Sequence, residues 1–235
     1  MRSDALAIYP KRGHALGLAS LFRNGMSLAS IVLKPPSVTT RDIPRGDGRI
    51  VLVIPAFLSG DWSTAGLRGF LSEIGYRVET AGVALNIGPT PRLVAKLEQT
   101  LLRLAASEGR PIDVIGQSLG GVLARDLAER HPHCVRHLIT LCSPIRVPIT
   151  TPLAPAARLL GAFYDSGWLA RRHRIVGPLP VPVTALYSED DGVVDWRECL
   201  QDEHPGSRNI RVSGAHATVG SNPSALIAIA AALSS

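Results

Sequence analysis

The middle of the chain reads Pro111-Ile-Asp-Val-Ile-Gly-Gln-Ser-Leu-Gly-Gly-Val-Leu-Ala-Arg-Asp-Leu-Ala-Glu-Arg130. Its first part, residues 112–115, is a short apolar run rich in β-branched side chains, which predicts a buried strand. Its last part, residues 119–130, places apolar side chains on one helical face and charged side chains on the other. A strand that runs directly into a helix leaves the joining residue, Ser118, at the tip of a tight turn.

The residues around this turn form a Gly-x-Ser-x-Gly pattern, from Gly116 to Gly120. The glycines leave room for the strand and the helix to approach each other closely. The hydroxyl of Ser118 is then expected above the sheet at the helix N-terminus, where the helix dipole favours a developing negative charge. This arrangement resembles the nucleophile elbow of the α/β-hydrolase superfamily. The alternative is a serine that caps a helix in another Rossmann-like fold.

Length and composition predict a single globular domain over residues 1–235. The net charge is +6, but the basic residues are scattered apart from residues 171–174, and no nucleic-acid motif is present. We therefore expect no nucleic-acid partner. The odd count of three cysteines without metal-ligand spacing predicts reduced thiols and a cytoplasmic setting. We expect no metal and no cofactor.

Apolar patterns alternate between strand and helix along most of the chain. This alternation predicts a mostly parallel sheet of about six strands flanked by helices. The expected strands are residues 50–54, 76–80, 112–115, 137–142, 183–187 and 209–212, and the expected helices are residues 63–74, 91–107, 119–130 and 223–233.

Two segments interrupt the alternation. Residues 1–45 are predicted to form an N-terminal helical extension that is too polar to span a membrane, with weak contact to a membrane surface as the alternative. Residues 143–182 are rich in proline and too long for an ordinary connection. We expect them to form a small lid with one short helix over about residues 152–170, and Phe163 and Trp168 of this lid to contact substrate. The alternative is a surface excursion with no role in binding.

A serine nucleophile needs a base within hydrogen-bond reach and an acid that orients the base. In the fold that the elbow resembles, the acid and the histidine follow the serine along the chain. His216 follows the last predicted strand and is the expected base. The segment Asp191-Gly-Val-Val resembles the turn that carries the acid in many α/β hydrolases, so Asp191 is the expected acid. Asp190 is the alternative, and Asp195 is expected to cap a helix.

An oxyanion hole needs two N–H donors. The first is expected from Leu119, which follows the serine, and the second from Phe57 in the loop after residues 50–54. Ala56 stands where many hydrolases have glycine, and we expect it to restrict the backbone there. Leu58 and Asn86, from neighbouring loops, are further expected substrate contacts. For Asn86 a purely structural role in closing its turn is the alternative.

A closer resemblance extends from residue 46 onward. The segments Pro55-x-Phe57, Leu141-x-Ser-Pro144, Tyr187-Ser-x-x-Asp-Gly-Val-Val-x-Trp196 and Gly214-x-His216 are similar to a group of bacterial lipase/esterase-like α/β hydrolases. This resemblance implies a serine hydrolase whose partner is a small-molecule ester, and the apolar lid residues favour an apolar acyl group. An acyltransferase or thioesterase with the same triad is an alternative, as is a non-catalytic lipid- or ligand-binding protein.

Overall fold

The computed structural model describes residues 40, 43–146, 149 and 151–235. Six strands form one sheet in the order β2-β1-β3-β4-β5-β6, and every neighbouring pair is parallel. The strands are β1 (Ile50–Ile54), β2 (Arg77–Thr80), β3 (Ile112–Gln117), β4 (Val135–Leu141), β5 (Val183–Tyr187) and β6 (Ser207–Arg211). Parallel pairing places all six carboxyl ends at one edge of the sheet, where ligands bind in folds of this kind.

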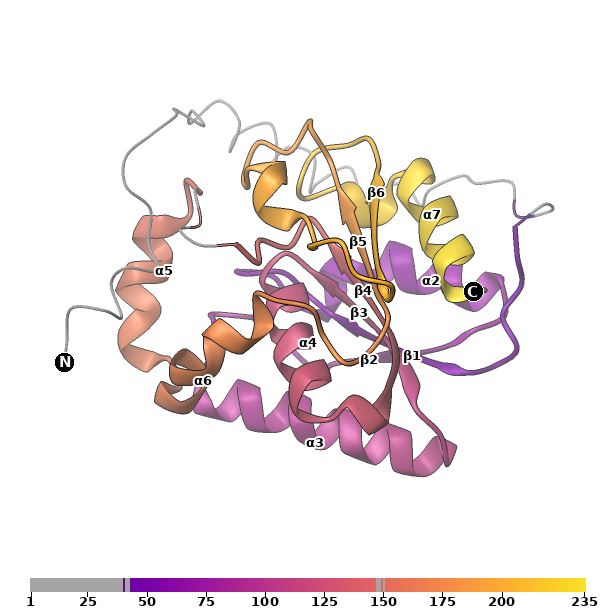
Figure 1. Cartoon of the computed structure of the whole chain (residues 1–235), viewed down its shortest axis with the longest axis horizontal. Helices are drawn as coiled ribbons and strands as arrows, with labels where there is room; N and C mark the ends of the chain where they lie inside the picture. Colours follow the sequence, from indigo (N-terminus) through magenta and orange to yellow (C-terminus); the bar gives the residue numbers. More distant parts are fainter. Residues whose placement is uncertain (1–39, 41–42, 147–148, 150) are drawn as a thin grey trace.

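Helices cover both faces of the sheet (Figure 1). The α-helices are α2 (Ala65–Glu73), α3 (Pro91–Glu108), α4 (Leu119–Arg130), α5 (Ala154–Leu160), α6 (Ser166–Arg171) and α7 (Pro223–Leu233). Short 3-10 helices are Asp61–Thr64, Pro132–Cys134, Gly161–Phe163, Arg172–Ile175, Trp196–Cys199 and Val219–Ser221. Helices α3 and α4 pack on one face, and α2 and α7 pack on the other.

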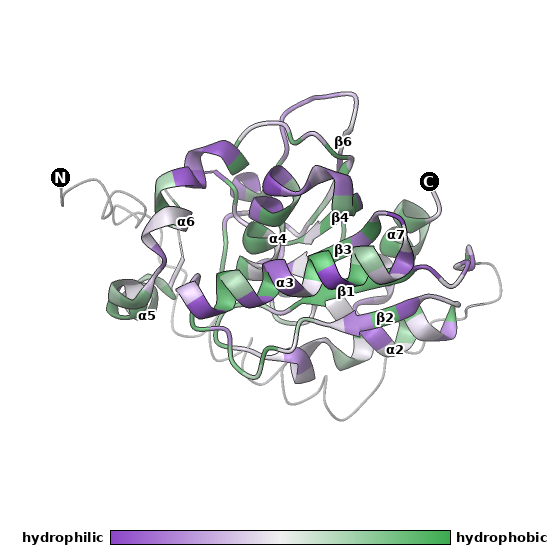
Figure 2. Ribbon diagram, turned by 90° about the horizontal axis from the view of Figure 1, so that it is seen from below, coloured by the Kyte–Doolittle hydropathy of each residue, from purple (hydrophilic) through white to green (hydrophobic). Residues whose placement is uncertain are grey.

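The central strands are buried on both faces because helices cover each side. Every residue of β1 and β3 is buried, whereas β6 at the edge is only partly covered. Helix α3 is amphipathic: Leu97, Leu101 and Leu104 face the core, and its charged residues face outward (Figure 2). Helix α4 is buried along most of its length because it crosses the centre of the sheet.

The predicted elements of the alternating region are confirmed, with bounds shifted by only a few residues. The prediction of one helix over residues 152–170 is wrong, because α5, a 3-10 turn and α6 share that segment. Tyr164 has an extended backbone and Asp165 caps α6 through Trp168 N, so the chain breaks and restarts there. The predicted extension over residues 1–45 lies almost wholly outside the described residues.

The turn between β3 and α4 depends on glycines that no other residue can replace without movement. A Cβ on Gly116 would lie 2.5 Å from backbone atoms of Gly120 and Gly121. A Cβ on Gly120 would lie 2.4 Å from the carbonyl oxygen of Ile54, at the end of β1. These approaches are far shorter than van der Waals contact, so the Gly-x-Ser-x-Gly pattern is a packing requirement of the elbow as well as a motif.

Replacing Gly120 by alanine should destabilise the protein, because the new Cβ meets backbone atoms that cannot rotate away. We expect the Gly120→Ala variant to lose at least about 1–3 kcal/mol of unfolding free energy in urea titrations. Gly69→Ala is the matched control. Gly69 is an exposed residue of α2 with nothing near the position of an added Cβ, so this change should stabilise by about 0.5–1 kcal/mol. Equal stability of the Gly120→Ala variant and the wild type would contradict the described packing.

Candidate active site

Ser118 occupies a strained turn at the carboxyl edge of the sheet. Its backbone has φ 52° and ψ −123°, a conformation that residues with a side chain rarely adopt. The Ser118 N–H donates to the carbonyl of Leu141 at 2.8 Å, and the Ser118 carbonyl accepts from Gly121 and Val122 at the start of α4. Strained residues of this kind cluster at functional sites, where the surrounding structure holds them in place.

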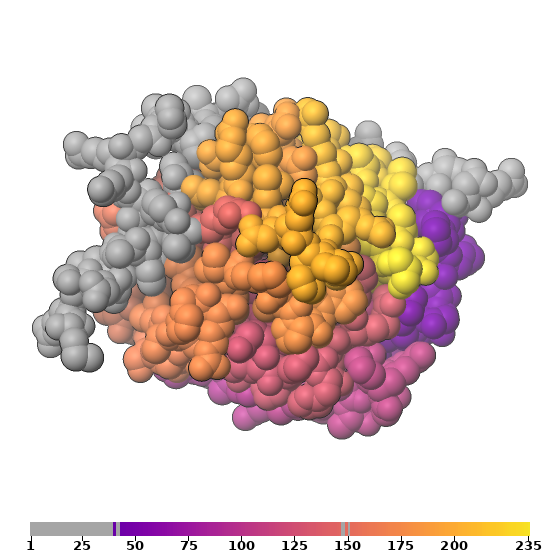
Figure 3. All heavy atoms as spheres, viewed as in Figure 1, coloured from indigo at the N-terminus to yellow at the C-terminus, as the bar shows by residue number. Residues whose placement is uncertain are grey.

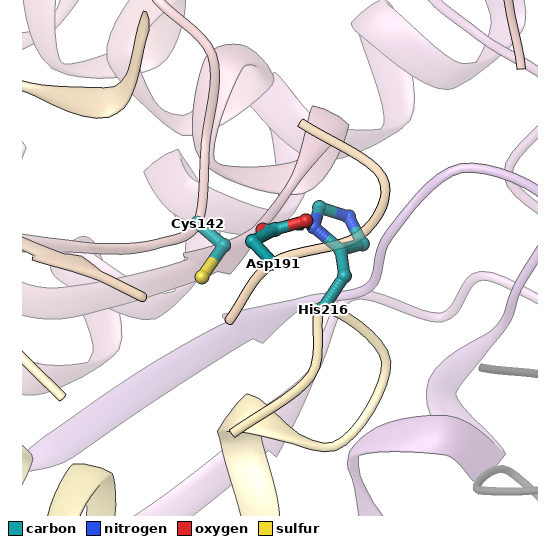
Figure 4. A group of neighbouring side chains, drawn as sticks. All are labelled: Cys142, Asp191 and His216. Atoms are coloured by element: carbon teal, nitrogen blue, oxygen red, sulfur yellow. Dashed lines mark hydrogen bonds and ion pairs between the residues drawn. The ribbon is translucent and has the colours of Figure 1, made fainter. Parts of the chain in front are cut away.

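His216 and Asp191 lie together at the same edge. His216 Nδ1 is 2.6 Å from Asp191 Oδ2, and both side chains are almost fully buried (Figure 4). The other carboxylate oxygen, Asp191 Oδ1, accepts from the backbone N–H groups of Val193 and Val194 at 2.8 and 2.9 Å. The turn after β5 therefore holds the Asp191 carboxylate in place, and the carboxylate in turn orients the His216 imidazole through Nδ1.

The two alternative acids lie elsewhere. Asp190 is exposed, and its backbone N–H donates to Ser188 Oγ. Asp195 caps the 3-10 helix Trp196–Cys199 by accepting from Arg197 N at 3.0 Å, as the sequence predicted. Of these three aspartates, only Asp191 contacts His216.

Two long-range hydrogen bonds fix the loop that carries His216. Gln117, the residue before Ser118, donates through Nε2 to the His216 carbonyl at 3.0 Å. Ser188 Oγ donates to the Gly214 carbonyl at 2.6 Å and joins the same loop to the end of β5. In this arrangement Ser118 Oγ makes no hydrogen bond with the His216 imidazole among the described residues.

The loop after β1 brings Phe57 to the same place. Phe57, Ser118 and Leu119 line one cavity, and among the described backbone hydrogen bonds neither Phe57 N–H nor Leu119 N–H is a donor. Both N–H groups are thus available to a ligand. Ala56 does not have a positive φ, so alanine in place of glycine imposes no left-handed strain at this position. The strained residue of this loop is Leu58, with φ 55°.

Asn86 is fully buried and does not line the cavity. Its Nδ2 donates to the Pro55 carbonyl at 2.9 Å, and its Oδ1 accepts from Gly88 N at 3.1 Å. Its backbone exchanges hydrogen bonds with Leu58 and Ser59. Asn86 therefore braces the loop that carries Phe57. Leu58 likewise does not line the cavity, and its side chain is exposed.

The cavity beside Ser118 has a volume of about 100 Å³ and a mostly apolar wall. Residues 151–172, which contain α5 and α6, form much of this wall and one end of the molecule (Figures 1 and 3). Trp168 lines the cavity and is buried. Phe163 is 62% exposed and does not line the cavity. Of the two predicted lid contacts, only Trp168 therefore lies at the cavity wall.

Cys142 lies on the far side of Asp191 from His216 (Figure 4). Ligand atoms of Cys142, Asp191 and His216 lie within 4.8 Å of one another, a spacing that a metal ion could use. A metal would need the thiolate form of Cys142. Burial, followed by the negative charge of Asp191, raises the pKa of the Cys142 thiol well above its usual value. The donor set therefore fits a protonated thiol beside a carboxylate better than a metal centre.

Sequence reasoning did not assign a role to several residues that shape the site. Gln117 lies within the recognised motif, but its partner is 99 residues away. Arg125 is fully buried and donates to the carbonyls of Ile175 and Gly177 at 2.6 and 2.7 Å. Burial lowers the pKa of Arg125 to about 10, so it stays protonated at neutral pH. Because Arg125 belongs to the charged face of a predicted amphipathic helix, the sequence pattern did not indicate that it would be buried.

Comparisons with known proteins give matches in structure only. No sequence-family profile and no curated protein sequence matches the chain. One solved structure, described with the metagenome-derived lipolytic enzymes LipS and LipT, has a TM-score of 0.59 at 16% identity over 82% of this chain and 96% of that chain. The mature lipase BlEst2 of Bacillus licheniformis has a TM-score of 0.58 at 13% identity, and the match covers 82% of this chain and 94% of that chain. A thioesterase domain from the curacin biosynthetic pathway has a TM-score of 0.50 at 16% identity, and the match covers 80% of this chain and 89% of that chain.

These likenesses show that the chain has the α/β-hydrolase fold. The parallel six-stranded sheet with helices on both faces is the architecture that the sequence predicted. Among the described residues, no helix is long and apolar enough to cross a membrane.

Thiol reactivity tests the packing around the site. All three cysteines are buried, and burial raises the pKa of each thiol, for Cys142 and Cys199 well above its usual value. Because only the thiolate attacks a disulfide reagent, the native protein should react with DTNB far more slowly than the unfolded protein at neutral pH. Unfolding in guanidinium should release all three thiols. Prompt labelling of Cys142 in the native protein, located by peptide mass spectrometry, would contradict the described burial.

Proposed function

We propose that this protein hydrolyses carboxylic esters, with Ser118 as nucleophile, His216 as base and Asp191 as the orienting acid. The observation that carries the proposal is the Asp191–His216 hydrogen bond at the sheet edge where the strained Ser118 turn opens into an apolar cavity. Nucleophilic catalysis by serine requires an imidazole base whose orientation is fixed by a carboxylate.

The reaction follows from the chemistry of these groups. His216 takes the proton of Ser118 as Oγ attacks the acyl carbonyl carbon, and a tetrahedral intermediate forms. His216 then gives this proton to the leaving alcohol oxygen, which departs and leaves an acyl-serine. A water molecule, deprotonated by His216, then attacks the acyl-serine. The bond between the acyl carbon and Ser118 Oγ breaks, His216 returns the proton to Oγ, and the carboxylic acid is released. We expect the Ser118–His216 hydrogen bond to form when substrate fills the cavity, as in many unliganded active sites.

The unused N–H groups of Phe57 and Leu119 support an oxyanion hole at the cavity wall. Donors that are fixed before substrate binds stabilise the developing oxyanion without reorganisation. Asn86 holds the Phe57 loop through the Pro55 carbonyl and its own backbone bonds, so its contribution is to position that donor.

The part of the predicted lid that lines much of the cavity, residues 151–172 (the cap), supports a substrate with an extended acyl group. Leu153, Leu169 and Trp168 face the same space as Ser118. Each buried methylene of the substrate would contribute about 0.8 kcal/mol. A thioesterase or an acyltransferase would use the same residues. Comparing oxygen esters with thioesters, and adding alcohols to detect transesterification, would distinguish these activities from ester hydrolysis.

The nucleophile is tested by Ser118→Ala. We expect hydrolysis of p-nitrophenyl esters by this variant to fall by about four orders of magnitude or more in kcat, because no acyl-enzyme can form. Ser143→Ala, which alters a buried hydroxyl bonded to the Leu141 carbonyl, serves as the control and should keep most of the activity. Retention of a tenth of wild-type activity by folded Ser118→Ala would show that another group attacks the ester.

The acid is tested by comparing Asn substitutions at Asp191, Asp190 and Asp195 at one pH. The Asp191→Asn variant should lose about two to four orders of magnitude in kcat, because the amide favours the wrong imidazole tautomer. The other two should stay within about threefold of wild type, since neither side chain contacts His216. A larger loss of kcat in the Asp190→Asn variant would show that Asp190, not Asp191, is the acid.

The cap is tested by Trp168→Ala and Phe163→Ala. Loss of the Trp168 ring should reduce kcat/KM for octanoyl esters about ten- to a hundredfold more than for acetyl esters, because the longer chain loses apolar contacts. Phe163→Ala should leave that preference nearly unchanged, since its side chain points to solvent. Equal effects of the two variants would mean that the cavity wall does not select the acyl chain.

A further inference from the structure

We propose that Asp126 is a positioning residue for the acyl group of the substrate. Its ion pair with Arg171 holds α6 in place, and α6 carries Trp168 at the cavity wall. Neither Asp126 nor Arg171 lines the cavity, so the pair acts through Trp168 rather than by contact with substrate. This inference rests on the proposed ester hydrolysis and concerns how the same site selects its acyl group.

The first observation is that the charged face of α4 is buried beneath the cap. The sequence pattern places Arg125 and Asp126 on the polar side of this helix, which would ordinarily face solvent. In the structure Arg125 is fully buried and Asp126 is only 3% exposed. Helix α6 and the 3-10 turn after it lie beside α4 (Figure 1). The polar face of α4 is therefore a surface on which the cap is seated.

The second observation is the geometry of the Asp126–Arg171 pair. Arg171 Nε donates to Asp126 Oδ1 at 2.6 Å, and Arg171 Nη2 donates to Oδ2 at 3.2 Å. A guanidinium that meets a carboxylate through two hydrogen bonds is fixed in direction as well as in distance. Arg130, one turn further along α4, donates to Asp126 Oδ2 at 3.1 Å. The carboxylate is thus itself held in place by its own helix.

The third observation is that α6 is too short to be stable by itself. It has six residues, and an isolated helix of that length does not persist in water. At its start, Asp165 Oδ1 accepts from Trp168 N at 2.6 Å, and Asp165 N donates to the Pro89 carbonyl at 2.7 Å. At its end, Arg171 pairs with Asp126. Tertiary contacts at both ends therefore determine where this helix lies.

The ion pair also determines how α6 is turned about its axis. Arg171 follows Trp168 by three residues, and side chains three apart lie on the same side of a helix. With the Arg171 guanidinium held on α4, the Trp168 ring is turned inward, where it is buried and lines the cavity. Apolar burial is not directional, whereas a buried ion pair can select one arrangement even where it adds little net stability.

The expected consequence of breaking the pair is a weaker preference for long acyl chains. The measured quantity is the ratio of kcat/KM for p-nitrophenyl octanoate to that for p-nitrophenyl acetate. Each methylene that loses its contact lowers kcat/KM about fourfold, so Asp126→Asn and Arg171→Gln should each lower the ratio about four- to fifteenfold. The fall should appear in KM for the octanoate with kcat nearly unchanged, because the wall contacts the acyl chain equally before and during the reaction.

Two variants of Arg171 keep the test decisive. Arg171→Gln leaves Asp126 paired with Arg130, so it serves if Asp126→Asn does not fold. Arg171→Lys keeps the charge but not the planar fork, so its ratio should lie between those of the wild type and Arg171→Gln. An unchanged ratio in folded Arg171→Gln would overturn the proposal.

The matched control is a second, exposed ion pair between α4 and the turn after α6. Arg174 Nη1 is 3.6 Å from Glu129 Oε1, and the Arg174 side chain is 59% exposed. Exposed pairs at this distance contribute little, so Glu129→Gln should leave the ratio unchanged. An equal fall in Glu129→Gln would assign the effect to the charge of α4 in general and would overturn the proposal.

A double-mutant cycle tests whether the pair acts through Trp168. In the Trp168→Ala background, Arg171→Gln should change the ratio by less than about twofold, because the ring that it positions is absent. A fall as large as that in the otherwise wild-type protein would show that the pair acts by another route, which contradicts the role proposed for Asp126.

Hydrogen exchange followed by mass spectrometry tests the pair without any substrate. Amides of residues 166–175 should exchange at least about tenfold faster in Arg171→Gln than in the wild type, and at the wild-type rate in Glu129→Gln. Unchanged exchange, or faster exchange with an unchanged ester ratio, overturns this inference and leaves the esterase intact. Failure of the wild type to hydrolyse either ester would contradict the proposed function itself, whereas exchange alone decides whether the pair holds α6.

Discussion

The left-handed backbone of Ser118 is the constraint on which the rest of this edge of the sheet depends. Strand β3 can pass directly into α4 only if Gly116 and Gly120 leave space for close contacts with neighbouring backbone atoms. The bond from Ser118 N–H to the Leu141 carbonyl holds the turn against β4. Strain of this kind costs about 1–3 kcal/mol, and it persists because a buried strand and a largely buried helix hold the turn from both sides.

Backbone strain also occurs in the turns next to Ser118. Among described residues other than glycine, only Leu58, Ser118 and Cys142 have positive φ, and they follow β1, β3 and β4 respectively. Three neighbouring strands thus end in strained turns at one edge. Cys142 places a protonated thiol beside Asp191, and the loop of Leu58 carries Phe57 to the cavity. The carboxyl edge of the sheet therefore brings these groups together from separate loops.

Local patterns predicted the parts of the fold that local forces determine. Strand β1 and helix α7 are apolar or periodic over their whole length, and their predicted bounds agree with the structure. Residues 152–170 were predicted as one helix but contain two, because the break at Tyr164 depends on tertiary contacts, such as that of Asp165 N with the Pro89 carbonyl. The roles of Arg125 and Gln117 were missed for the same reason: their partners lie far away in sequence.

For the site, the sequence predicted the contact between Asp191 and His216 but not how that pair is supported. The contact between Asp191 and His216 was expected from a turn motif and chain order, and the structure brings the two side chains together. Asn86 was expected to contact substrate, yet the structure gives it the bracing role that the sequence left as an alternative. Phe163 was grouped with Trp168 by spacing alone, and spacing does not determine which side of a short helix faces a cavity.

The central claim is that Ser118 is an activated nucleophile, and covalent trapping tests it most directly. The protein would be treated with a fluorophosphonate, digested and mapped by mass spectrometry, with a His216→Ala variant treated in parallel. The account predicts one phosphonyl adduct per chain, on the peptide that contains Ser118, and its loss in the His216→Ala variant. No adduct on the folded wild type, or an adduct on a different residue, would contradict it.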